Sequence, residues 1–499
     1  MARRLRTAAL LLLSVAAACH DSAVSVPPTF DRFYYPTGLA VRRNCTTPGS
    51  CQTLPDGGCI AGTTGCQSDL LVASSNFDLR YDAATGGTVL QIDVDRALAG
   101  DASAAAGAFV DGSVLGTARM GSFAGDVAVV DDVTCPGWTG APQVLVTSRE
   151  ANALFRLDVG GDGSLSCGAG CELSLPANLV DPYGVTVVCG DVAPAEGGAA
   201  APRHLAFVTY LQAANAQGVI SEGFVSRVDL HTGAIEANYD LGAGPTQTTA
   251  RDARRGLLFV SERFSTVGVA RLRWIDLAFP QLASGAVDYG PVVRGAELVT
   301  LALSSDKPPS RAYVAARLYD VDTATSSGTR PVGDVGGALL VLDLERVLAG
   351  APAADTVVRV VPLGRGPTAI VTIPRLDLTG NPLLDAAGNP LRDLVAVTSS
   401  DDGSMTLYDD QIGQAAAVFG FCGSGAPVDA SAPAPCPGGN PSLGQQPFGV
   451  AYEPYQLNGQ ALARLFVGSF DRSWVNAIVL EPAHPALPLS WARIGLERK

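Results

Sequence analysis

Short apolar runs, separated by Gly, Pro, Asn and Asp, follow one another along almost the whole chain. The first unit of this pattern holds such runs at 37–41, 69–74, 87–94 and 113–120. Each run is rich in Val, Leu or Ile, and each is shorter than the roughly 10–12 residues that a helix needs. Runs of this kind between turn-forming residues are typical of strands, so the pattern predicts an all-β protein.

The pattern repeats in units that end with an apolar residue, an Asp and a second apolar residue. This phrase occurs as Ile92-Asp93-Val94, Leu157-Asp158-Val159, Val228-Asp229-Leu230, Ile275-Asp276-Leu277 and Leu342-Asp343-Leu344, with looser copies at Tyr408-Asp409 and Leu480-Glu481. Successive acids are 47 to 72 residues apart, so a unit of similar size is built about seven times. Because an Asp carboxylate can accept the backbone N–H two residues on, each phrase is expected to end a third strand in a turn.

Seven units of four short strands, each burying an apolar face against its neighbours, predict a seven-bladed β-propeller over residues 29–499. Short helical turns are expected to replace the Asp turn at 95–100 and 345–350. The scarcity of helical pattern disfavours parallel α/β folds. Two shorter propellers or stacked sandwiches stay open as alternatives, although no linker between two halves is evident.

The overall composition limits the classes of function. The chain has 499 residues, of which 47% are hydrophobic and 16% are charged, so it is globular rather than disordered. Its formal net charge of −14 disfavours nucleic acid as a partner, because such binding depends on basic patches that neutralise phosphates.

The N-terminus carries the pattern of a bacterial export signal. Arginines precede an apolar stretch at 8–18, which predicts a signal peptide over residues 1–18. Val15-Ala-Ala-Ala-Cys19 resembles a lipobox, in which Cys19 receives a lipid and 19–28 forms a tether, whereas ordinary cleavage after 16–18 fits the same residues. Setting Cys19 aside leaves ten of eleven cysteines, an even number that favours the lipoprotein. The expected location is the cell envelope, on the outer membrane.

The other cysteines fall in loop insertions. Four of them lie in an insertion at 42–68, between the first two strands: Cys45, Cys51, Cys59 and Cys66. Their spacing lacks paired C-x-x-C and a nearby His, so disulfides are expected there instead of a zinc site, with the pairing open. Further bridges are expected as Cys167–Cys171, Cys135–Cys189 and Cys422–Cys436.

The order of the motifs carries a family resemblance. Openings at Pro36-Thr37-Gly38, Pro182-Tyr183-Gly184 and Pro447-Phe448-Gly449 precede a Leu-x-Val-Ala/Thr-Ser type of strand and then the apolar-Asp-apolar phrase. This order resembles that of YVTN-type, lactonase-like seven-bladed propellers and covers roughly 36–496. Units two and five depart from it most, because they open with Gly125-Asp126 and Glu297. The resemblance implies a fold and leaves the activity open, since propellers host many functions.

Candidate catalytic residues are few. The four histidines lie away from the entries into innermost strands, so none is expected to be catalytic. Asp126, Asp181 and Glu297 fall near those entries, where they could converge on the axis as a carboxylate or calcium site. Solvated turn residues are the simpler interpretation, and no cofactor or metal site is predicted. An enzyme of this kind would be a lactonase-like or other carboxylate-based hydrolase.

Polar residues follow the second strand in most units, on the same rim of a propeller as the entries. Turn chemistry explains them, and a binding rim is the functional alternative. The candidate rim residues are Asn76, Asp78, Arg149, Glu150, Glu262, Arg263, Asp401, Asp402, Asp471 and Arg472. The sequence favours a lipid-anchored, non-catalytic envelope propeller that acts as a binding or scaffold module. Its expected partners are the membrane, through the lipid, and an envelope protein or small ligand, with the rim arginines as protein anchors.

Overall fold

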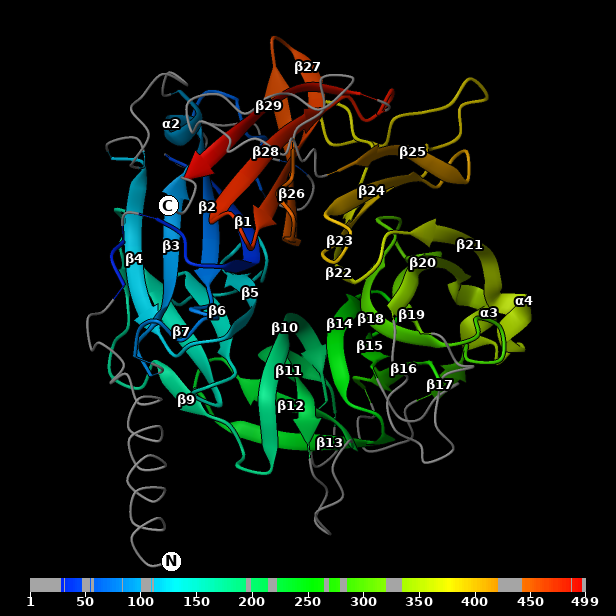
Figure 1. The fold of residues 1–499 in the computed structure, drawn as a ribbon, viewed down its shortest axis with the longest axis horizontal. Coiled ribbons are helices and arrows are strands. Elements are labelled where there is room, and N and C mark those ends of the chain that lie inside the picture. Colours follow the sequence, from blue (N-terminus) through cyan, green and yellow to red (C-terminus); the bar gives the residue numbers. More distant parts are fainter. Residues whose placement is uncertain are drawn as a thin grey trace, which may run out of the picture.

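The computed structural model describes residues 28–30, 32–46, 54, 58–82, 84–99, 109, 112–193, 199–213, 222–263, 269–278, 285–319, 334–420, 442–485 and 487–495. These residues form seven antiparallel sheets arranged in a ring about a common axis (Figure 1). Each sheet contains four strands in chain order, and the second sheet adds a short fifth strand. The prediction of an all-β, seven-bladed propeller with disulfide-bearing loops is confirmed.

The strands of each blade follow one another from the axis outward. Blades 1 to 3 are formed by β1 (Pro36–Cys45), β2 (Cys66–Ser74), β3 (Gly87–Asp93), β4 (Val114–Met120); β5 (Ala124–Val130), β6 (Gln143–Ser148), β7 (Ala153–Val159), β8 (Leu165–Ser166), β9 (Glu172–Ser174); β10 (Leu179–Val192), β11 (Ala201–Ala213), β12 (Glu222–Asp229) and β13 (Ile235–Ala243). Blades 4 and 5 are formed by β14 (Thr246–Asp252), β15 (Leu257–Glu262), β16 (Arg271–Asp276), β17 (Gly285–Asp288); β18 (Ala296–Leu303), β19 (Arg311–Tyr319), β20 (Asp334–Asp343) and β21 (Val357–Leu363). Blades 6 and 7 are formed by β22 (Pro367–Ile373), β23 (Leu394–Ser399), β24 (Ser404–Asp409), β25 (Gln414–Phe419); β26 (Pro447–Leu457), β27 (Gln460–Ser469), β28 (Trp474–Leu480) and β29 (Pro488–Gly495).

In five of the seven blades the Asp of the repeated phrase ends the third strand, as the pattern predicts, whereas β7 continues past Asp158 to Val159 and β28 ends at Leu480. Asp229, the last residue of β12, accepts the backbone N–H of His231 at 3.0 Å, which closes an Asx-turn. In blade 5 the equivalent residue caps a helix, since Asp343 accepts the N–H of Arg346. The expected helical turns are confirmed as α2 (Val94–Ala99) and α3 (Leu344–Leu348), and α4 (Ala353–Thr356) follows the second of them.

A bulge interrupts every innermost strand near its entry, where the pairing with the second strand shifts register. A hydroxyl of the second strand fastens this bulge to the next blade. In blade 3, Thr209 of β11 accepts the N–H of Gly184 at 2.9 Å and donates to the carbonyl of Gln247 in blade 4 at 2.5 Å. The equivalent pair of bonds is made by Thr147, Ser261 and Thr398. The Thr or Ser late in the second strand therefore connects two neighbouring blades through its hydrogen bonds.

The Gly of the Pro-x-Gly opening is needed because a neighbouring blade approaches closely. A Cβ on Gly184 would lie 2.5 Å from the carbonyl oxygen of Gln247, and a Cβ on Gly449 would lie 2.6 Å from that of Thr37. No side chain fits at these distances without moving backbone, so the opening turn is a blade-packing motif.

The ring closes between blades 7 and 1, which lie side by side in Figure 1, although each blade is one continuous segment and no strand is exchanged. A buried ion pair within blade 7 makes polar contacts with blade 1. Arg464 of β27 pairs with Glu453 of β26 and reaches Asp95 of α2 at 3.2 Å. Ser68 of β2 donates its hydroxyl to the same Glu453. The two ends of the propeller are thus connected through one guanidinium and one carboxylate.

Disulfides reinforce the loops. The described residues contain Cys59–Cys66, Cys135–Cys189 and Cys167–Cys171, with Cα atoms 5.7, 5.2 and 5.3 Å apart. The second and third bridges confirm the expected pairs, while the first supplies a pairing that the sequence left open, and Cys45 is also disulfide-bonded. Cys19 and the expected pair Cys422–Cys436 lie outside the described residues. Within the described ranges, no helix is long and apolar enough to cross a membrane.

Candidate functional site

Loops at the two ends of the propeller axis provide two candidate sites. The loops after second strands and the entries into innermost strands lie at one end, which we call the rim. The loops between first and second strands, and between third and fourth strands, lie at the other end, which we call the base. The candidate binding residues named from sequence belong to the rim, whereas the base carries a cleft.

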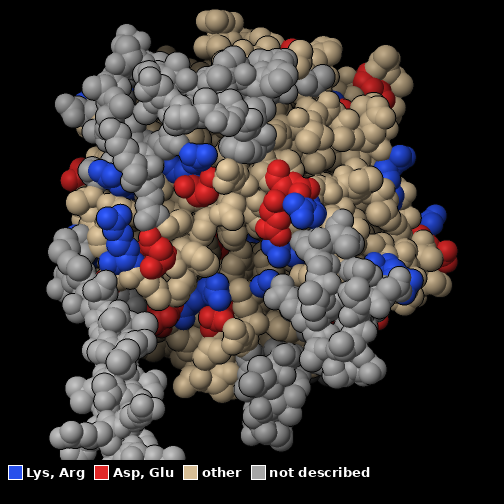
Figure 2. Space-filling view, in the orientation of Figure 1, with Lys and Arg blue, Asp and Glu red and all other residues tan. Residues whose placement is uncertain are grey.

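Rim arginines pair with acids at the entry of the next blade. Arg149, after β6, lies 3.3 Å from Asp181 in β10, and Arg263, after β15, lies 2.6 Å from Glu297 in β18. Around the central hollow in Figure 2, basic and acidic side chains likewise lie next to one another. Two of the three expected rim arginines and two of the expected axial acids therefore form ion pairs that link successive blades.

Two further pairs lie on the rim. Asp402 pairs with Arg365 at 2.7 Å, and Asp471 pairs with Arg472 at 3.2 Å. Asp471 also accepts the backbone N–H of Gln446 at 3.0 Å, which fixes the loop before β26. Charge on the rim is therefore largely balanced by contacts within the chain.

Two of the proposed rim residues do not present their side chains to solvent. Glu262 is buried and pairs with Arg273 of β16 at 2.7 Å. Asn76 is buried; it donates to the hydroxyl of Ser122 at 2.8 Å and accepts the backbone N–H of Tyr81 at 3.3 Å, so it holds its own turn. Four members of the set are exposed at the rim, namely Asp78, Glu150, Asp401 and Asp402.

The three proposed axial acids form no cluster with one another. Asp126 bridges blades 2 and 3, since its carboxylate accepts the N–H of Val127 at 2.9 Å and that of Val185 at 3.3 Å. Burial raises the pKa of Asp126 to about 6. In the part of the chain that the structure describes, no three His, Cys, Asp or Glu side chains lie close enough to hold a metal ion. Asp126 thus contributes to the contact between blades.

An aromatic cluster, absent from the residues proposed from sequence, lies on the rim. It consists of five rings from blade 1, blade 7 and the entry to blade 2, namely Tyr35, Phe77, Phe123, Phe448 and Phe470, with contacting centroids 4.9–6.3 Å apart. The side chain of Phe77 is 53% exposed. The sequence signal that could have found the cluster is the aromatic residue directly before an innermost strand, which is Tyr35 in blade 1 and Phe123 in blade 2.

The base carries a cleft of about 790 Å³ between blades 5 and 6. Its walls are the β18–β19 loop at 304–310 and the long β22–β23 loop at 374–393, with Leu54 of blade 1 added. The long loop folds as two turns, because Asp377 and Asp385 each accept the N–H of an Asn four residues on. The volume lies within the roughly 300–1,000 Å³ that is typical of small-molecule sites.

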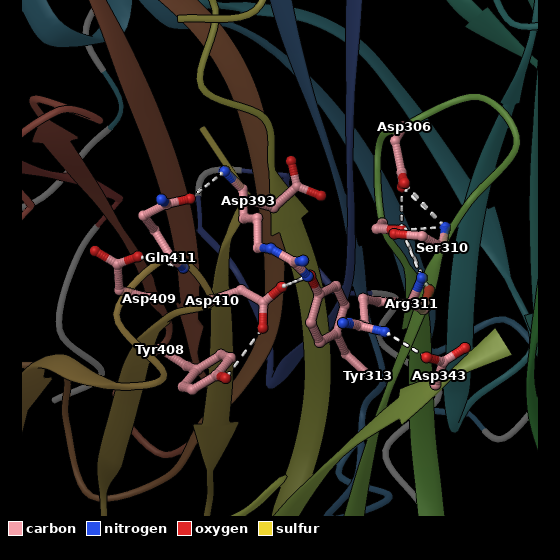
Figure 3. A network of polar contacts seen from close by, with 12 residues as sticks. Asp306, Ser310, Arg311, Tyr313, Asp343, Asp393, Tyr408, Asp409, Asp410 and Gln411 are labelled. Carbon is pink, nitrogen blue, oxygen red and sulfur yellow. Dashed lines mark hydrogen bonds and ion pairs between the residues drawn. The ribbon is translucent and has the colours of Figure 1, made fainter. Parts of the chain in front are cut away.

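A hydrogen-bonded carboxylate lies at one side of this cleft (Figure 3). Asp410 accepts the hydroxyl of Tyr313 at 3.2 Å and that of Tyr408 at 3.1 Å, and Arg392 lies 3.4 Å away. Burial raises the pKa of Tyr313, and the carboxylate of Asp410 raises it further, so the phenol stays protonated and donates. The position of Asp410 is therefore fixed by three donors from blades 5 and 6.

A second carboxylate joins the two walls. The oxygens of Asp393 accept the N–H and the hydroxyl of Ser305 at 2.7 and 2.5 Å. Burial raises the pKa of Asp393 to about 6, although the bonds from Ser305 act in the opposite direction. Asp393 therefore titrates in a mildly acidic range while it holds the β18–β19 loop in place.

Four cations line the cleft, and two of them are accessible to a ligand. Arg311 and Arg375 are mostly buried and engaged in ion pairs behind the wall. Lys307 is exposed in the β18–β19 loop, and the side chain of Arg392 is 48% exposed. The accessible positive charge of the cleft wall is thus carried by Lys307 and Arg392, beside the exposed carboxylate of Asp306.

A histidine pair also lies at the base, between blades 2 and 3. His204 Nδ1 and His231 Nε2 are 2.8 Å apart, and the His231 ring stacks on Trp138 with centroids 4.8 Å apart. Burial, together with the neighbouring His231, lowers the pKa of His204. The neutral form of His204 is therefore favoured, and the His231 ring packs against an indole.

These features define a seven-bladed β-propeller with an ion-paired, aromatic rim and a cleft at its base. No family model matches the chain, and no curated protein matches it. Among solved structures it is similar to a hydrazine synthase of Kuenenia stuttgartiensis, with 10% identity, 93% of this chain and 99% of that chain covered, and a TM-score of 0.49. It is also similar to a functionally unknown protein from Desulfotomaculum acetoxidans DSM 771. The identity is 12%, the match covers 82% of this chain and 96% of that chain, and the TM-score is 0.41. Likenesses this remote carry no argument about function.

Proposed function

We propose that the protein is a lipid-anchored, non-catalytic propeller of the cell envelope, which binds a small amphipathic organic anion in the cleft at its base. The observation that carries this proposal is the cleft, which combines apolar walls with two accessible cations. The rim favours it indirectly, because Arg149, Arg263 and Arg472 are engaged in ion pairs within the chain. A protein partner would have to displace those pairs before using the arginines as anchors.

The lining of the cleft fits a ligand with an apolar body and an acidic end. The apolar walls are formed by Leu54, Pro374, Leu376, Pro382, Pro390 and Leu391. Apolar surface buried against them contributes about 25 cal/mol per Å². Lys307 and Arg392 can donate charge-assisted hydrogen bonds to a carboxylate or sulfonate. The prolines also keep the long loop stiff, so little order has to be gained on binding.

Anilinonaphthalene sulfonate is a suitable probe, because it is an amphipathic anion whose fluorescence rises when it is shielded from water. Lys307→Gln and Arg392→Gln each remove one cation of the cleft. Loss of a hydrogen bond to a charged group costs about 1.5–3 kcal/mol, which weakens binding roughly ten- to a hundredfold. Arg254→Gln, an exposed cation at the base beyond the cleft, is the matched control. Equal affinity in all three variants contradicts the cleft as the binding site.

A carboxylate-based hydrolase is the second candidate, favoured by one specific observation. Asp393 and Asp410 lie in one cleft in different environments, and pairs of this kind can divide acid and base roles. Binding is preferred because both oxygens of Asp393 are already engaged by Ser305. Lactone or ester hydrolysis that disappears in Asp393→Asn, while the variant stays folded, would replace the binding function by catalysis.

The anchor rests on the lipobox-like sequence that ends at Cys19. Cys19→Ala should prevent acylation and move the protein from the detergent phase to the aqueous phase after phase separation. Unchanged partitioning of the variant contradicts the anchor and leaves the cleft untouched.

A further inference from the structure

Two large apolar side chains project from the β2–β3 loop of blade 1, beside the aromatic cluster. Phe77 is 53% exposed and Leu79 is 43% exposed. Phe77 contacts Phe123 and Phe470 with centroids 5.5 and 5.2 Å apart, so the exposed ring continues into a packed group. Single exposed apolar residues are common, whereas a contiguous group of this kind marks an interaction surface.

The backbone is strained where it presents these side chains. Tyr35, Leu79 and Phe123 adopt φ angles of 58°, 49° and 55°. Bulky residues rarely occupy this left-handed region, because the Cβ crowds the backbone. At the position equivalent to Tyr35 and Phe123, blades 5 and 6 carry Gly295 and Gly366. Aromatic residues stand where glycine would relieve the strain, and such strain concentrates at functional sites.

The chain enters the propeller on the same side of the molecule. The carbonyl of Pro28 accepts a hydrogen bond from Arg119 at 3.4 Å, near the end of β4 at the rim. Tyr34 packs edge-on against Tyr81 of the β2–β3 loop, with centroids 5.2 Å apart. Eight residues, 20–27, separate Cys19 from Pro28, and nine extended steps reach at most about 30 Å. A lipid on Cys19 would therefore hold the bilayer near the rim.

We propose that the aromatic cluster docks on the bilayer interface, with Phe77 and Leu79 entering the headgroup region. This inference rests on the lipid anchor proposed above and identifies the surface that the anchor presents to the membrane. Aromatic rings are favoured at that depth because they combine an apolar body with a polar edge or a large quadrupole. The exposed carboxylates of Asp78 and Asp82 outnumber the exposed guanidinium of Arg80 in the same loop, and the net charge of −14 also opposes attraction to anionic lipid. Docking is therefore apolar, and added salt does not weaken it. The cleft at the base then opens away from the membrane.

Lipidated protein with Phe77→Trp, reconstituted into phosphatidylethanolamine–phosphatidylglycerol vesicles, tests the docking. Its emission is measured as the difference from the parent, which contains four Trp. Trp at position 77 should shift to shorter wavelength and be quenched by brominated lipid. Leu384→Trp is the matched control, because Leu384 is 59% exposed in the β22–β23 loop at the base and should remain unquenched. Flotation of both variants with the vesicles tests, independently of the docking, whether the lipid anchor binds the protein to the membrane.

The outcomes separate the two proposals. Protein that floats while Trp at position 77 stays unquenched overturns the docking and retains the anchor. Quenching at position 384 instead of 77 places the base on the membrane and also overturns it. Protein that does not float overturns the anchor and the docking together. A blue shift at position 77 that depends on protein concentration, and not on brominated lipid, assigns the cluster to a second copy of the chain.

Discussion

Replacing Arg464 with Leu should lower the free energy of unfolding by about 3–5 kcal/mol, the usual cost of removing one partner of a buried ion pair. The side chain of Arg464 is 2% exposed, and that of Glu453 is fully buried. Without the guanidinium, the Glu453 carboxylate retains the hydroxyl of Ser68 as a donor, which cannot offset the loss of hydration of a buried charge. Because Arg464 and Glu453 of blade 7 also contact Asp95 and Ser68 of blade 1, the loss should appear in global stability.

Substitutions of the residues that contact Arg464 should change the free energy of unfolding by different amounts. Asp95 is 46% exposed, so Asp95→Ala should cost at most about 1 kcal/mol. The double variant Glu453→Leu and Arg464→Leu removes both charges and should recover most of the loss. Burial raises the pKa of Glu453, so a carboxyl left without its partner takes up a proton in acid. The loss caused by Arg464→Leu should therefore be smaller at pH 5 than at pH 8.

Urea unfolding followed by circular dichroism at the two pH values measures these differences. A loss below about 1 kcal/mol for Arg464→Leu, which is typical of a surface pair, would refute the reasoning. An equal loss at pH 5 and pH 8 would show that the uncompensated carboxylate is not the cause.

Three further predictions concern stability. The free energy of unfolding should fall as pH rises from 3.8 to about 6 and then level off. Burial raises the pKa of Asp69 and Asp393, so the folded chain binds those protons more tightly than the unfolded chain does. Asp393→Asn should therefore flatten the dependence of stability on pH. Thr209→Val should cost about 1–3 kcal/mol in urea, because a buried N–H and carbonyl lose their partner, whereas exposed Thr379→Val should cost less. Replacing Cys135 and Cys189 by Ser should cost about 4 kcal/mol from loop closure over 54 residues, against about 2 for the four-residue Cys167–Cys171 loop; equal shifts in Tm would contradict this.

Local chemistry made much of the fold predictable. The apolar run at 69–74 lies within β2, and in most blades the Asp that closes the unit ends the third strand, because its carboxylate turns the chain. The Pro-x-Gly and Thr-Ser motifs were recognisable as repeats, but their cause lies between blades. Gly184 and Thr209 meet Gln247 of the next blade, a contact that no single repeat encodes.

The candidate sites were less predictable, because each depends on which loops meet. Arg149 and Asp181 are 32 positions apart and belong to consecutive blades, so sequence assigned them to two separate groups. The cleft joins Ser305 to Asp393, which are 88 positions apart. The order of the strands in the chain does not show that these two loops face each other. The aromatic cluster combines residues from both ends of the chain, which only ring closure brings together.

Native mass spectrometry of the protein, purified gently from envelope membranes, tests the proposed binding function most directly. The account predicts a discrete added mass for a small anion on the wild-type chain. That mass should be lost from the double variant Lys307→Gln and Arg392→Gln and retained by Arg254→Gln. A wild-type chain that carries no mass beyond its lipid, or an added mass that survives in the double variant, contradicts the cleft as a ligand site.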